Sequence, residues 1–391
     1  MSASFKIPFK GRGHSYSQEE IDLVAEIMSD SDTLTQGKYL QLFEQKYREF
    51  LATDHAFAMS SATSALEIAA QLCSFSDEDE VIIPSHTYTS SAYPFVKKGA
   101  KIIWADIDFK SRVVNAKTIE SKITKKTRAV VVVHLYGYIA DMPEIRQLCV
   151  DNGLTLIEDC AQSLGTSLNG KRAGTYGDMS IFSHHSQKNI STLGEGGVLV
   201  VKNPQYAEII PMLRHNGHSG YQDQKYYWKP AMSNVDYPKL NGNYIEPNNY
   251  CLGEPQCAVG SMIIDRVDSV NSLKRSRAIQ FIDDLAGFEQ LIFHRVDNER
   301  HNYQHLVAFV QNEKRDQFIK KMFLDKGIQC VVQYYPLHRY PYYVKHGLGK
   351  ADCPNTELFF DSMVSFPFYE TMKDSEIEYM LESTISTLKS L

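Results

Sequence analysis

The chain has 391 residues, of which 43% are hydrophobic and 23% are charged, as is ordinary for a globular protein. Its formal net charge is -6 and no basic tract stands out, which argues against nucleic-acid binding. The length predicts one large and one smaller domain. No segment offers the roughly 18 uninterrupted apolar residues that a membrane helix needs.

The cysteines indicate a reducing environment. There are seven of them, they are scattered, and none forms a CxxC pair. This distribution predicts free thiols instead of a disulfide framework. The first twenty residues also lack the apolar stretch of a signal peptide. The sequence therefore predicts a cytoplasmic protein.

Helical periodicity comes first along the chain. Residues 17–29 and 38–50 each place their apolar side chains on one stripe, and Ser17 can cap the first helix. Strands and helices then alternate. Strands are predicted at residues 55–59, 80–83, 101–104, 129–134, 155–157, 179–182 and 197–201, with helices at 64–72, 90–97 and 142–151.

Apolar strands separated by helices predict an α/β fold in which helices flank a mostly parallel sheet. Such sheets bind ligands at the carboxyl ends of their strands. Residues 215–250 are rich in Asn, Tyr and Gly and predict a long irregular loop. Beyond it, a helix is expected from 257 toward 276, followed by a β-α-β unit formed by residues 306–310, 315–326 and 328–333. We therefore expect a large domain over residues 1–250 and a smaller α/β domain over 251–391.

A lysine lies between a strand and a glycine-rich turn in FSHHSQKNISTLGEGG, residues 182–197. Most lysines are simply solvated. Here Gly194, Gly196 and Gly197 form a tight turn leading into the next strand, so Lys188 is held in a rigid, enclosed place. A flexible amine in such a place suits Schiff-base chemistry.

Two more segments place polar groups after strands. In LIEDCAQSLG, Asp159 ends an apolar strand, and there it either meets a cationic ligand or caps the next helix. In MSSATSAL, small residues open a helix whose first N–H groups can bind an anion, and Thr63 can add its hydroxyl. Serine and threonine at a helix start are more often simple caps, so this signal is weak alone.

Taken together and in this order, the motifs SSATSAL, PSHTYTSSA, VHLYGYIADM, EDCAQSLG and FSHHSQKNISTLGEGG resemble the sugar aminotransferases of the DegT/DnrJ/EryC1/StrS family. The segments LTQGKYLQLFEQKY, NNYCLGEPQCAVG, YYPLH and SFPFYE extend the resemblance over nearly the whole chain. The resemblance implies the aspartate-aminotransferase-type (type I) fold, the cofactor pyridoxal 5'-phosphate, and a homodimer whose active sites lie at the subunit interface.

The resemblance also implies a role for each matching residue. Lys188 would bind the cofactor aldehyde as an imine and later move a proton between substrate and cofactor. Asp159 would pair with the pyridine nitrogen and Gln162 with the ring hydroxyl. Tyr88 would stack on the ring. The phosphate would be held by Ala62, Thr63 and Ser183, and by Asn249 from the other subunit.

The match is imperfect at two places near the substrate. Cys251 stands where the family often has an arginine, and Gln333 where it commonly has a histidine. The polar side chains of residues 215–250 suit a polyhydroxylated ligand or a dimer contact equally well. His86, His134, His184 and His185 lack the i, i+4 spacing of helical metal ligands, so we expect no metal.

The function implied is transfer of an amino group from an amino acid, L-glutamate being the expected donor, to a keto sugar in lipopolysaccharide or other surface-polysaccharide synthesis. The keto sugar is either nucleotide-linked or a free keto sugar acid such as an oxidised octulosonate. Two alternatives stay open. Some relatives that dehydrate sugars have histidine at the lysine position, which Lys188 fills here, and a non-catalytic cofactor-binding sensor is also possible.

Overall fold

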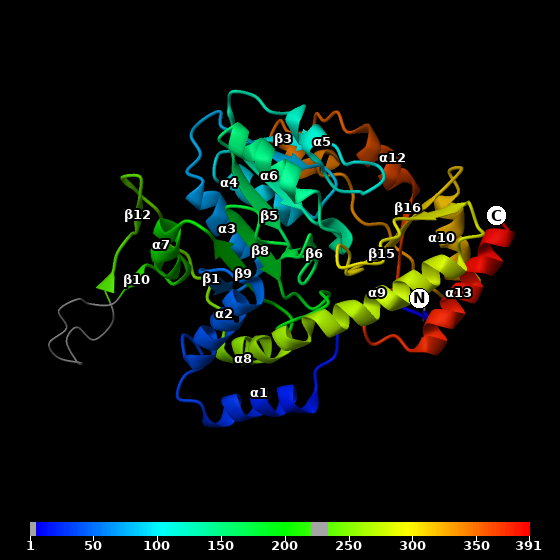
Figure 1. Ribbon diagram of the computed structural model, residues 1–391, viewed down its shortest axis with the longest axis horizontal. Coiled ribbons are helices and arrows are strands. Elements are labelled where there is room, and N and C mark those ends of the chain that lie inside the picture. The colour runs from blue at the N-terminus through cyan, green and yellow to red at the C-terminus, as the bar shows by residue number, and fades with distance from the viewer. Residues whose placement is uncertain (1–4, 220–233) are drawn as a thin grey trace.

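The computed structural model describes residues 5–219 and 234–391. Figure 1 shows two unequal parts joined by one long helical run. The larger part is built around a seven-stranded sheet, and the smaller part holds the C-terminal helices and a three-stranded sheet. The predicted fold class, a large sheet domain with a smaller α/β part, is confirmed.

The large sheet is parallel apart from one strand. Strand β9 pairs antiparallel with both of its neighbours, whereas the pairings from β8 to β3 are all parallel. The central residues of its strands are apolar and buried, as expected of a sheet that is covered on both faces, whereas polar residues stand at several strand ends. In spatial order they are β1 (Ala56–Met59), β9 (Gly197–Val201), β8 (Met179–Ser183), β5 (Thr155–Asp159), β4 (Thr127–Val133), β2 (Glu80–Pro84) and β3 (Lys101–Ala105).

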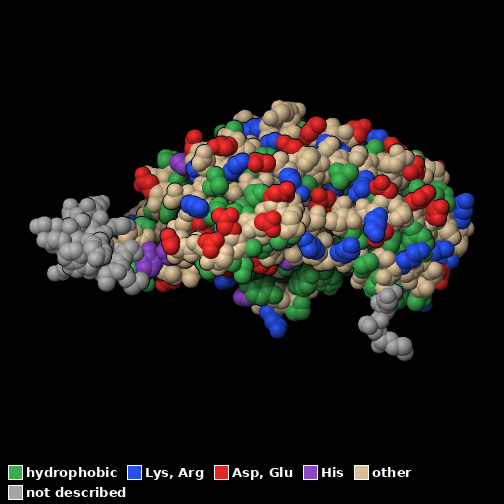
Figure 2. Space-filling view, turned by 90° about the horizontal axis from the view of Figure 1, so that it is seen from below, with side chains coloured by type: hydrophobic (Ala, Val, Ile, Leu, Met, Phe, Trp, Pro, Cys, Tyr) green, Lys and Arg blue, Asp and Glu red, His purple; other side chains and the backbone are tan. Residues whose placement is uncertain are grey.

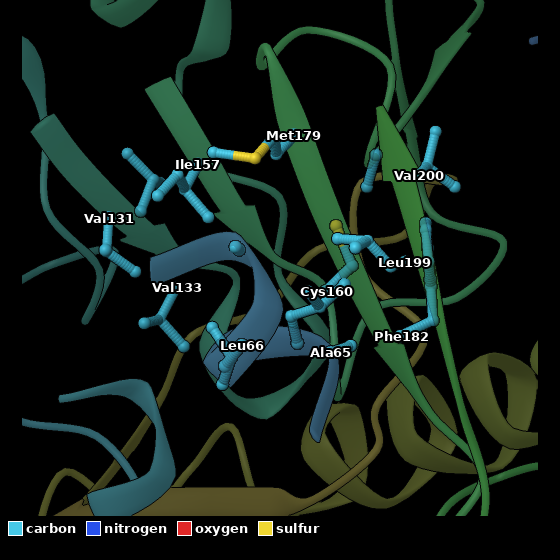
Figure 3. Packing of buried hydrophobic residues seen from close by; sticks show 14 of the residues in the cluster. Ala65, Leu66, Val131, Val133, Ile157, Cys160, Met179, Phe182, Leu199 and Val200 are labelled. Atoms are coloured by element: carbon cyan, nitrogen blue, oxygen red, sulfur yellow. The ribbon is translucent and has the colours of Figure 1, made fainter. Parts of the chain in front are cut away.

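Helix α3 covers the middle of this sheet. Figure 3 shows Ala65 and Leu66 on α3 among apolar side chains of β4, β5, β8 and β9, and both residues are buried. This packing fixes the start of α3 beside the carboxyl ends of β5 and β8. The helices of the larger part are α1 (Gln18–Asp30), α2 (Lys38–Leu51), α3 (Ala62–Leu72), α4 (Tyr93–Lys97), α5 (Ala116–Glu120), α6 (Met142–Asp151) and α7 (Pro204–Arg214).

The smaller part has an antiparallel sheet in the order β14 (Leu291–Phe293), β15 (Leu306–Val310) and β16 (Met363–Phe366). The predicted β-α-β unit is therefore wrong. Both edges of β15 are taken by antiparallel partners, so residues 328–333 form no strand there. They are extended and make only isolated bridges, Ile328 with Ile7 and Val331 with Ser365. The helices of this part are α10 (Arg315–Leu324) and α13 (Asp374–Lys389).

A nearly continuous helical run joins the two parts, as predicted for the segment after residue 257. It consists of α8 (Glu254–Ile263), a 3-10 turn η3 (Ile264–Arg266) and α9 (Val267–Asp284). Cys257 and Val259 on α8 belong to the larger hydrophobic core, whereas Ala278 and Phe281 on α9 belong to the smaller one. The run therefore crosses from one core to the other, and the boundary at residue 250 stays a prediction.

The predicted loop 215–250 is irregular where it is described, apart from two short antiparallel strand pairs. Its residues 220–233 lie outside the described part of the chain.

Figure 2 shows acidic and basic side chains mixed over one face of the molecule. Within residues 5–219 and 234–391, no helix is long and apolar enough to span a membrane. The remaining short elements are η1 (Thr89–Ser91), η2 (Leu135–Gly137), β6 (Ser167–Leu168), β7 (Lys171–Arg172), β10 (His218–Ser219), β11 (Asn234–Val235), β12 (Lys239–Leu240), β13 (Asn243–Tyr244), η4 (Leu337–Arg339), α11 (Pro341–Lys345) and α12 (Pro354–Ser362).

Candidate active site

A cavity of about 250 Å³ opens beyond the carboxyl ends of β4, β5 and β8. This is the edge at which parallel α/β sheets bind ligands. The fold brings residues from widely separated segments of the sequence to its wall. Seven of the predicted site residues line it, namely Ala62, Thr63, Tyr88, Asp159, Gln162, Ser183 and Lys188.

Lys188 reaches the cavity from the loop between β8 and β9. This loop is tightly tied, because Ser186 N–H donates to the Gly194 carbonyl and Thr192 N–H to the His184 carbonyl. In the described chain, the Lys188 amine has no ion-pair partner within 4 Å. Burial lowers the pKa of Lys188 to about 8, although the negative charges of Asp159 and Glu195 raise it in part. A substantial fraction of this amine is therefore neutral near pH 8, which is the form that attacks a carbonyl.

Asp159 ends β5 and is only 3% exposed. Ser91 Oγ donates to its Oδ2 at 2.6 Å and Ala161 N–H to its Oδ1 at 3.1 Å. Burial raises the pKa of Asp159, and these two hydrogen bonds and the charge of Lys188 oppose the rise. Among the residues that the structure describes, no cation forms an ion pair with this carboxylate, so a cationic group of a ligand would find a ready counter-ion. The role of Ser91 was missed, although it lies in the PSHTYTSSA motif.

The first turn of α3 forms an anion cradle at one end of the cavity. Ser61 caps the helix by accepting the Ser64 N–H at 3.1 Å. The N–H groups of Ala62 and Thr63 come before Ser64 in the first turn, where a helix offers no acceptor of its own. The backbone of Gly197 lies directly against this turn, where a Cβ would sit 2.4 Å from the Ala62 nitrogen. The glycine is required because any side chain would push β9 away from the cradle.

Gln162 is held at both ends of its amide. Its Oε1 accepts the Tyr136 N–H at 2.6 Å and its Nε2 donates to the Tyr334 hydroxyl at 2.9 Å. Tyr334 also lines the cavity and lies 5.9 Å, centroid to centroid, from the ring of Tyr88. Tyr88 itself is 56% exposed, so its ring is free to cover a ligand. Tyr334 was not among the predicted site residues, because its YYPLH motif lies far away in the sequence.

Behind the lysine loop lies a buried polar network that sequence reasoning also missed. Lys274 on α9 is 2% exposed, and its amine donates to Asn189 Oδ1 at 2.7 Å and to the Gln304 carbonyl at 3.2 Å. The Gln304 amide accepts the Asn189 N–H and donates to the Gln187 carbonyl. Both neighbours of Lys188 are thus fixed by the smaller part of the molecule. A lone lysine in a helix gives no sequence signal for such a role.

Asn249 does not line this cavity. It is exposed, and its backbone pairs with His215 in an isolated bridge. The two unusual positions lie apart from each other. Cys251 Sγ donates to the Arg214 carbonyl, whereas Gln333 lines the cavity and its buried Oε1 has no partner in the described chain.

The four histidines weighed as metal ligands lie in separate contacts. His86 meets the Tyr136 hydroxyl, His184 the Tyr47 hydroxyl, and His134 the Glu158 carboxylate at 3.0 Å. His185 lies 3.8 Å from the Glu195 carboxylate. The ligand atoms of His134, Glu158 and Cys160 come within 4.8 Å of one another. The Glu158 carboxylate, however, already accepts three backbone N–H groups, those of residues 174, 176 and 177. These contacts account for Glu158 as the anchor of the loop before β8.

The cavity fits pyridoxal 5'-phosphate. The cofactor carries an aldehyde, a ring nitrogen that can be cationic, and a phosphate. Within the described chain, the cavity offers the Lys188 amine and the buried Asp159 carboxylate, neither of which has an ion-pair partner. It also offers the open N–H groups at the start of α3. Each chemical feature of the cofactor thus has a complementary group on the cavity wall.

Comparisons with known proteins agree with this geometry. Residues 15–384 match the DegT/DnrJ/EryC1/StrS aminotransferase family. GDP-perosamine synthase of Vibrio cholerae is 32% identical over 88% of this chain and 89% of its own. The dTDP-3-amino-3,4,6-trideoxy-alpha-D-glucose transaminase of Streptomyces venezuelae is 30% identical over 93% of this chain and 91% of its own.

Solved structures share the fold. One of them is PseC of Helicobacter pylori, an aminotransferase involved in the biosynthesis of pseudoaminic acid. It superposes with a TM-score of 0.88 and is 23% identical in sequence, and the match covers 98% of this chain and 100% of that one. The family match covers nearly the full length of the chain, and one cavity holds an amine, a carboxylate and an anion cradle. The chain belongs to the DegT/DnrJ/EryC1/StrS aminotransferase family and is a pyridoxal-phosphate-dependent sugar aminotransferase.

Proposed function

We propose that this aminotransferase moves an amino group from L-glutamate to a keto sugar through Lys188. The observation that carries the proposal is the unpaired, partly buried Lys188 amine facing Asp159 across one cavity. The bound cofactor supplies an electron sink for the carbon that gains or loses the amine. Lys188 would hold the cofactor through its amine and, once released from it, would take up and give back a proton at its Nζ.

The other residues would hold and orient the cofactor. Asp159 would keep a positive charge on the ring nitrogen, and Ser91 fixes the direction of the Asp159 carboxylate. Gln162, which is fixed by Tyr136 and Tyr334, would donate to the ring hydroxyl. Tyr88 would cover the ring. The first N–H groups of α3, Thr63 and Ser183 would bind the phosphate.

The assignment of Lys188 is tested by trapping. Borohydride reduction followed by peptide mapping should locate the cofactor at position 188. Lys188→Ala should lose the adduct and amine transfer, whereas the control Lys171→Ala, at an exposed lysine outside the cavity, should keep both. A reduced adduct at any other lysine, or amine transfer that survives in Lys188→Ala, would contradict the proposal.

We further propose that the enzyme is a cytoplasmic homodimer in which Asn249 completes the partner's site. The position of Asn249 supports this proposal, because the residue is exposed and does not line the cavity of its own subunit. Lys188→Ala and Asn249→Ala subunits can be mixed under conditions that allow exchange. If sites are shared, a mixed dimer has one intact site, and random mixing restores about a quarter of wild-type activity. If Asn249 serves its own subunit, mixing restores nothing.

The acceptor is proposed to be a nucleotide-linked keto sugar, or a free keto sugar acid such as an oxidised octulosonate, used in lipopolysaccharide or other surface-polysaccharide synthesis. Two relatives support the first class, because one is named for a GDP-linked amino sugar and the other for a dTDP-linked one. Gln333, in place of a common histidine, supports an unusual acceptor, because its Oε1 is free to meet a sugar hydroxyl.

Half-reactions separate the substrate candidates. Each amino acid is tested for its ability to bleach the yellow enzyme, and each keto sugar for its ability to restore the colour. L-Glutamate should bleach it, and one acceptor class should restore it with an amino sugar as product. A ketone consumed without nitrogen transfer would favour dehydration. Indifference to all donors would favour a sensor.

A further inference from the structure

The loop after β3 buries an arginine. Arg112 is 4% exposed, and its backbone has a φ of 66°, in the left-handed region. Burial lowers the pKa of Arg112 to about 10, so the guanidinium still carries its charge at neutral pH. A buried cation of this kind ordinarily requires a carboxylate or another anion beside it.

Arg112 has no such partner in the part of the chain that the structure describes. Its Nε is fully enclosed without a hydrogen bond, and no carboxylate lies within 4 Å of its guanidinium. Its side chain instead packs over the ring of Phe359, 4.8 Å from the centroid. The ring face and the more distant charge of Asp108 attract the cation, but neither accepts its hydrogen bonds.

The arginine lines a small cavity between the two hydrophobic cores. The volume is about 10 Å³, which is room for one particle about the size of a water molecule. The larger part of the molecule contributes Ser111, Arg112 and Tyr136, and the smaller part contributes His294 and His305. No aspartate or glutamate is among the lining residues.

Several other polar side chains lie on the wall, and the hydroxyls of Tyr136 and Tyr303 are already hydrogen-bonded elsewhere. His301 is already committed, because its Nδ1 accepts the Tyr303 N–H and its ring bonds the Gly137 backbone. The ring nitrogens of His294 and His305 have no hydrogen-bond partner within residues 5–219 and 234–391. Burial lowers the pKa of His294 to about 4 and holds that of His305 well below its usual range, so each ring is neutral and has one N–H to donate.

We propose that this cavity binds a single monoatomic anion, chloride under cellular conditions, as the counter-ion of Arg112. The surroundings are a guanidinium with free donors, two histidine N–H groups and the Ser111 hydroxyl. The volume is too small for a polyatomic anion such as phosphate or a carboxylate, whereas a single halide ion is only slightly larger than a water molecule. A water molecule would fit but would leave the buried charge uncompensated. Because the wall is shared, the ion would stabilise the contact between the two cores.

Anomalous scattering locates such an ion directly. Crystals of the holoenzyme are soaked in sodium bromide, which replaces chloride, and data are collected at the bromine absorption edge. The expected result is an anomalous peak within hydrogen-bond distance of the Arg112 guanidinium. The absence of a peak there, with a water in its place, overturns the proposal.

Thermal unfolding gives an independent measure in solution. Sodium chloride is exchanged for sodium gluconate at constant ionic strength, and Tm of the wild type should rise with chloride by on the order of 3 °C. Arg112→Gln should lose this dependence. Arg300→Gln is the matched control, because Arg300 lies nearby but already pairs with Asp141 at 2.7 Å, and it should retain the dependence.

A chloride response that persists unchanged in Arg112→Gln overturns the proposal, as does a wild-type Tm that is indifferent to chloride. If Arg112→Gln fails to fold, the bromide experiment still decides the question, because it uses the unaltered chain.

Discussion

The backbone of Gly13 lies directly against the main-chain carbonyl of Lys188. A Cβ at position 13 would come within 2.2 Å of that oxygen, and the Gly13 N–H donates to the Ser186 carbonyl at 2.7 Å. On the other side, the Gly13 carbonyl accepts the Glu370 N–H. The N-terminal segment is therefore clamped between the Lys188 loop and the C-terminal part of the chain.

Gly13→Ala should therefore displace the Lys188 loop. The overlap with backbone atoms costs about 1–3 kcal/mol, and a shift of about 1 Å in the reacting amine lowers kcat by roughly 10²-fold. Steady-state kinetics and chemical denaturation measure both effects. Gly11→Ala is the control, since a Cβ there meets nothing within 4 Å, and it should behave as wild type. Equal behaviour of the two variants would contradict the predicted clamp.

The charge of Asp159 should set the pH range in which Lys188 reacts. With the pKa of Lys188 at about 8, its neutral fraction rises with pH and reaches one half near pH 8. Asp159 raises that pKa, so Asp159→Asn should lower it and move the midpoint to a lower pH. The midpoint can be measured in the cofactor-free protein from the rate of Lys188 labelling by an amine-reactive reagent, with peptide mapping. A midpoint that stays in place or moves to a higher pH would refute this assignment.

Amine transfer by Asp159→Asn should fall by about 10²–10³-fold.

Lys274 should make stability depend on pH. Burial lowers its pKa to about 7, so between pH 7 and the ordinary lysine value of 10.5 the unfolded chain binds more protons than the folded one. The free energy of unfolding therefore rises with pH in this window, by up to about 1.4 kcal/mol per pH unit. Lys274→Met should flatten the rise between pH 7 and 8, as measured by urea denaturation. An unchanged slope would show that Lys274 does not titrate there.

Gly197→Ala should weaken cofactor binding. The added Cβ would lie 2.4 Å from the Ala62 nitrogen, inside the anion cradle. We expect a rise in the Kd for pyridoxal 5'-phosphate of at least about tenfold, equivalent to about 1.4 kcal/mol. Gly287→Ala, where a Cβ meets nothing within 4 Å, is the control. If both variants bind the cofactor with wild-type affinity, the cradle does not hold the phosphate.

Local chemistry allowed much of the sheet domain to be predicted from sequence. Runs such as residues 130–133 are apolar and β-branched, and a strand buried on both faces needs that composition. Asp159 and Lys188 could be identified because each follows a strand whose end is visible in the sequence. The family motifs then gave these residues their chemical roles, since each motif is a continuous segment.

Only the tertiary structure decided the contacts between distant segments. The strand predicted at residues 328–333 is absent because β14 and β16 occupy both edges of β15, a competition that no local pattern reveals. Lys274 supports the site from α9, and its neighbours in sequence carry no sign of it. Ser91 and Tyr334 lie within motifs that the sequence shows, but only the fold reveals that they contact Asp159 and Gln162. Periodicity records which face of an element is buried, but the partner that buries it depends on how the whole chain packs.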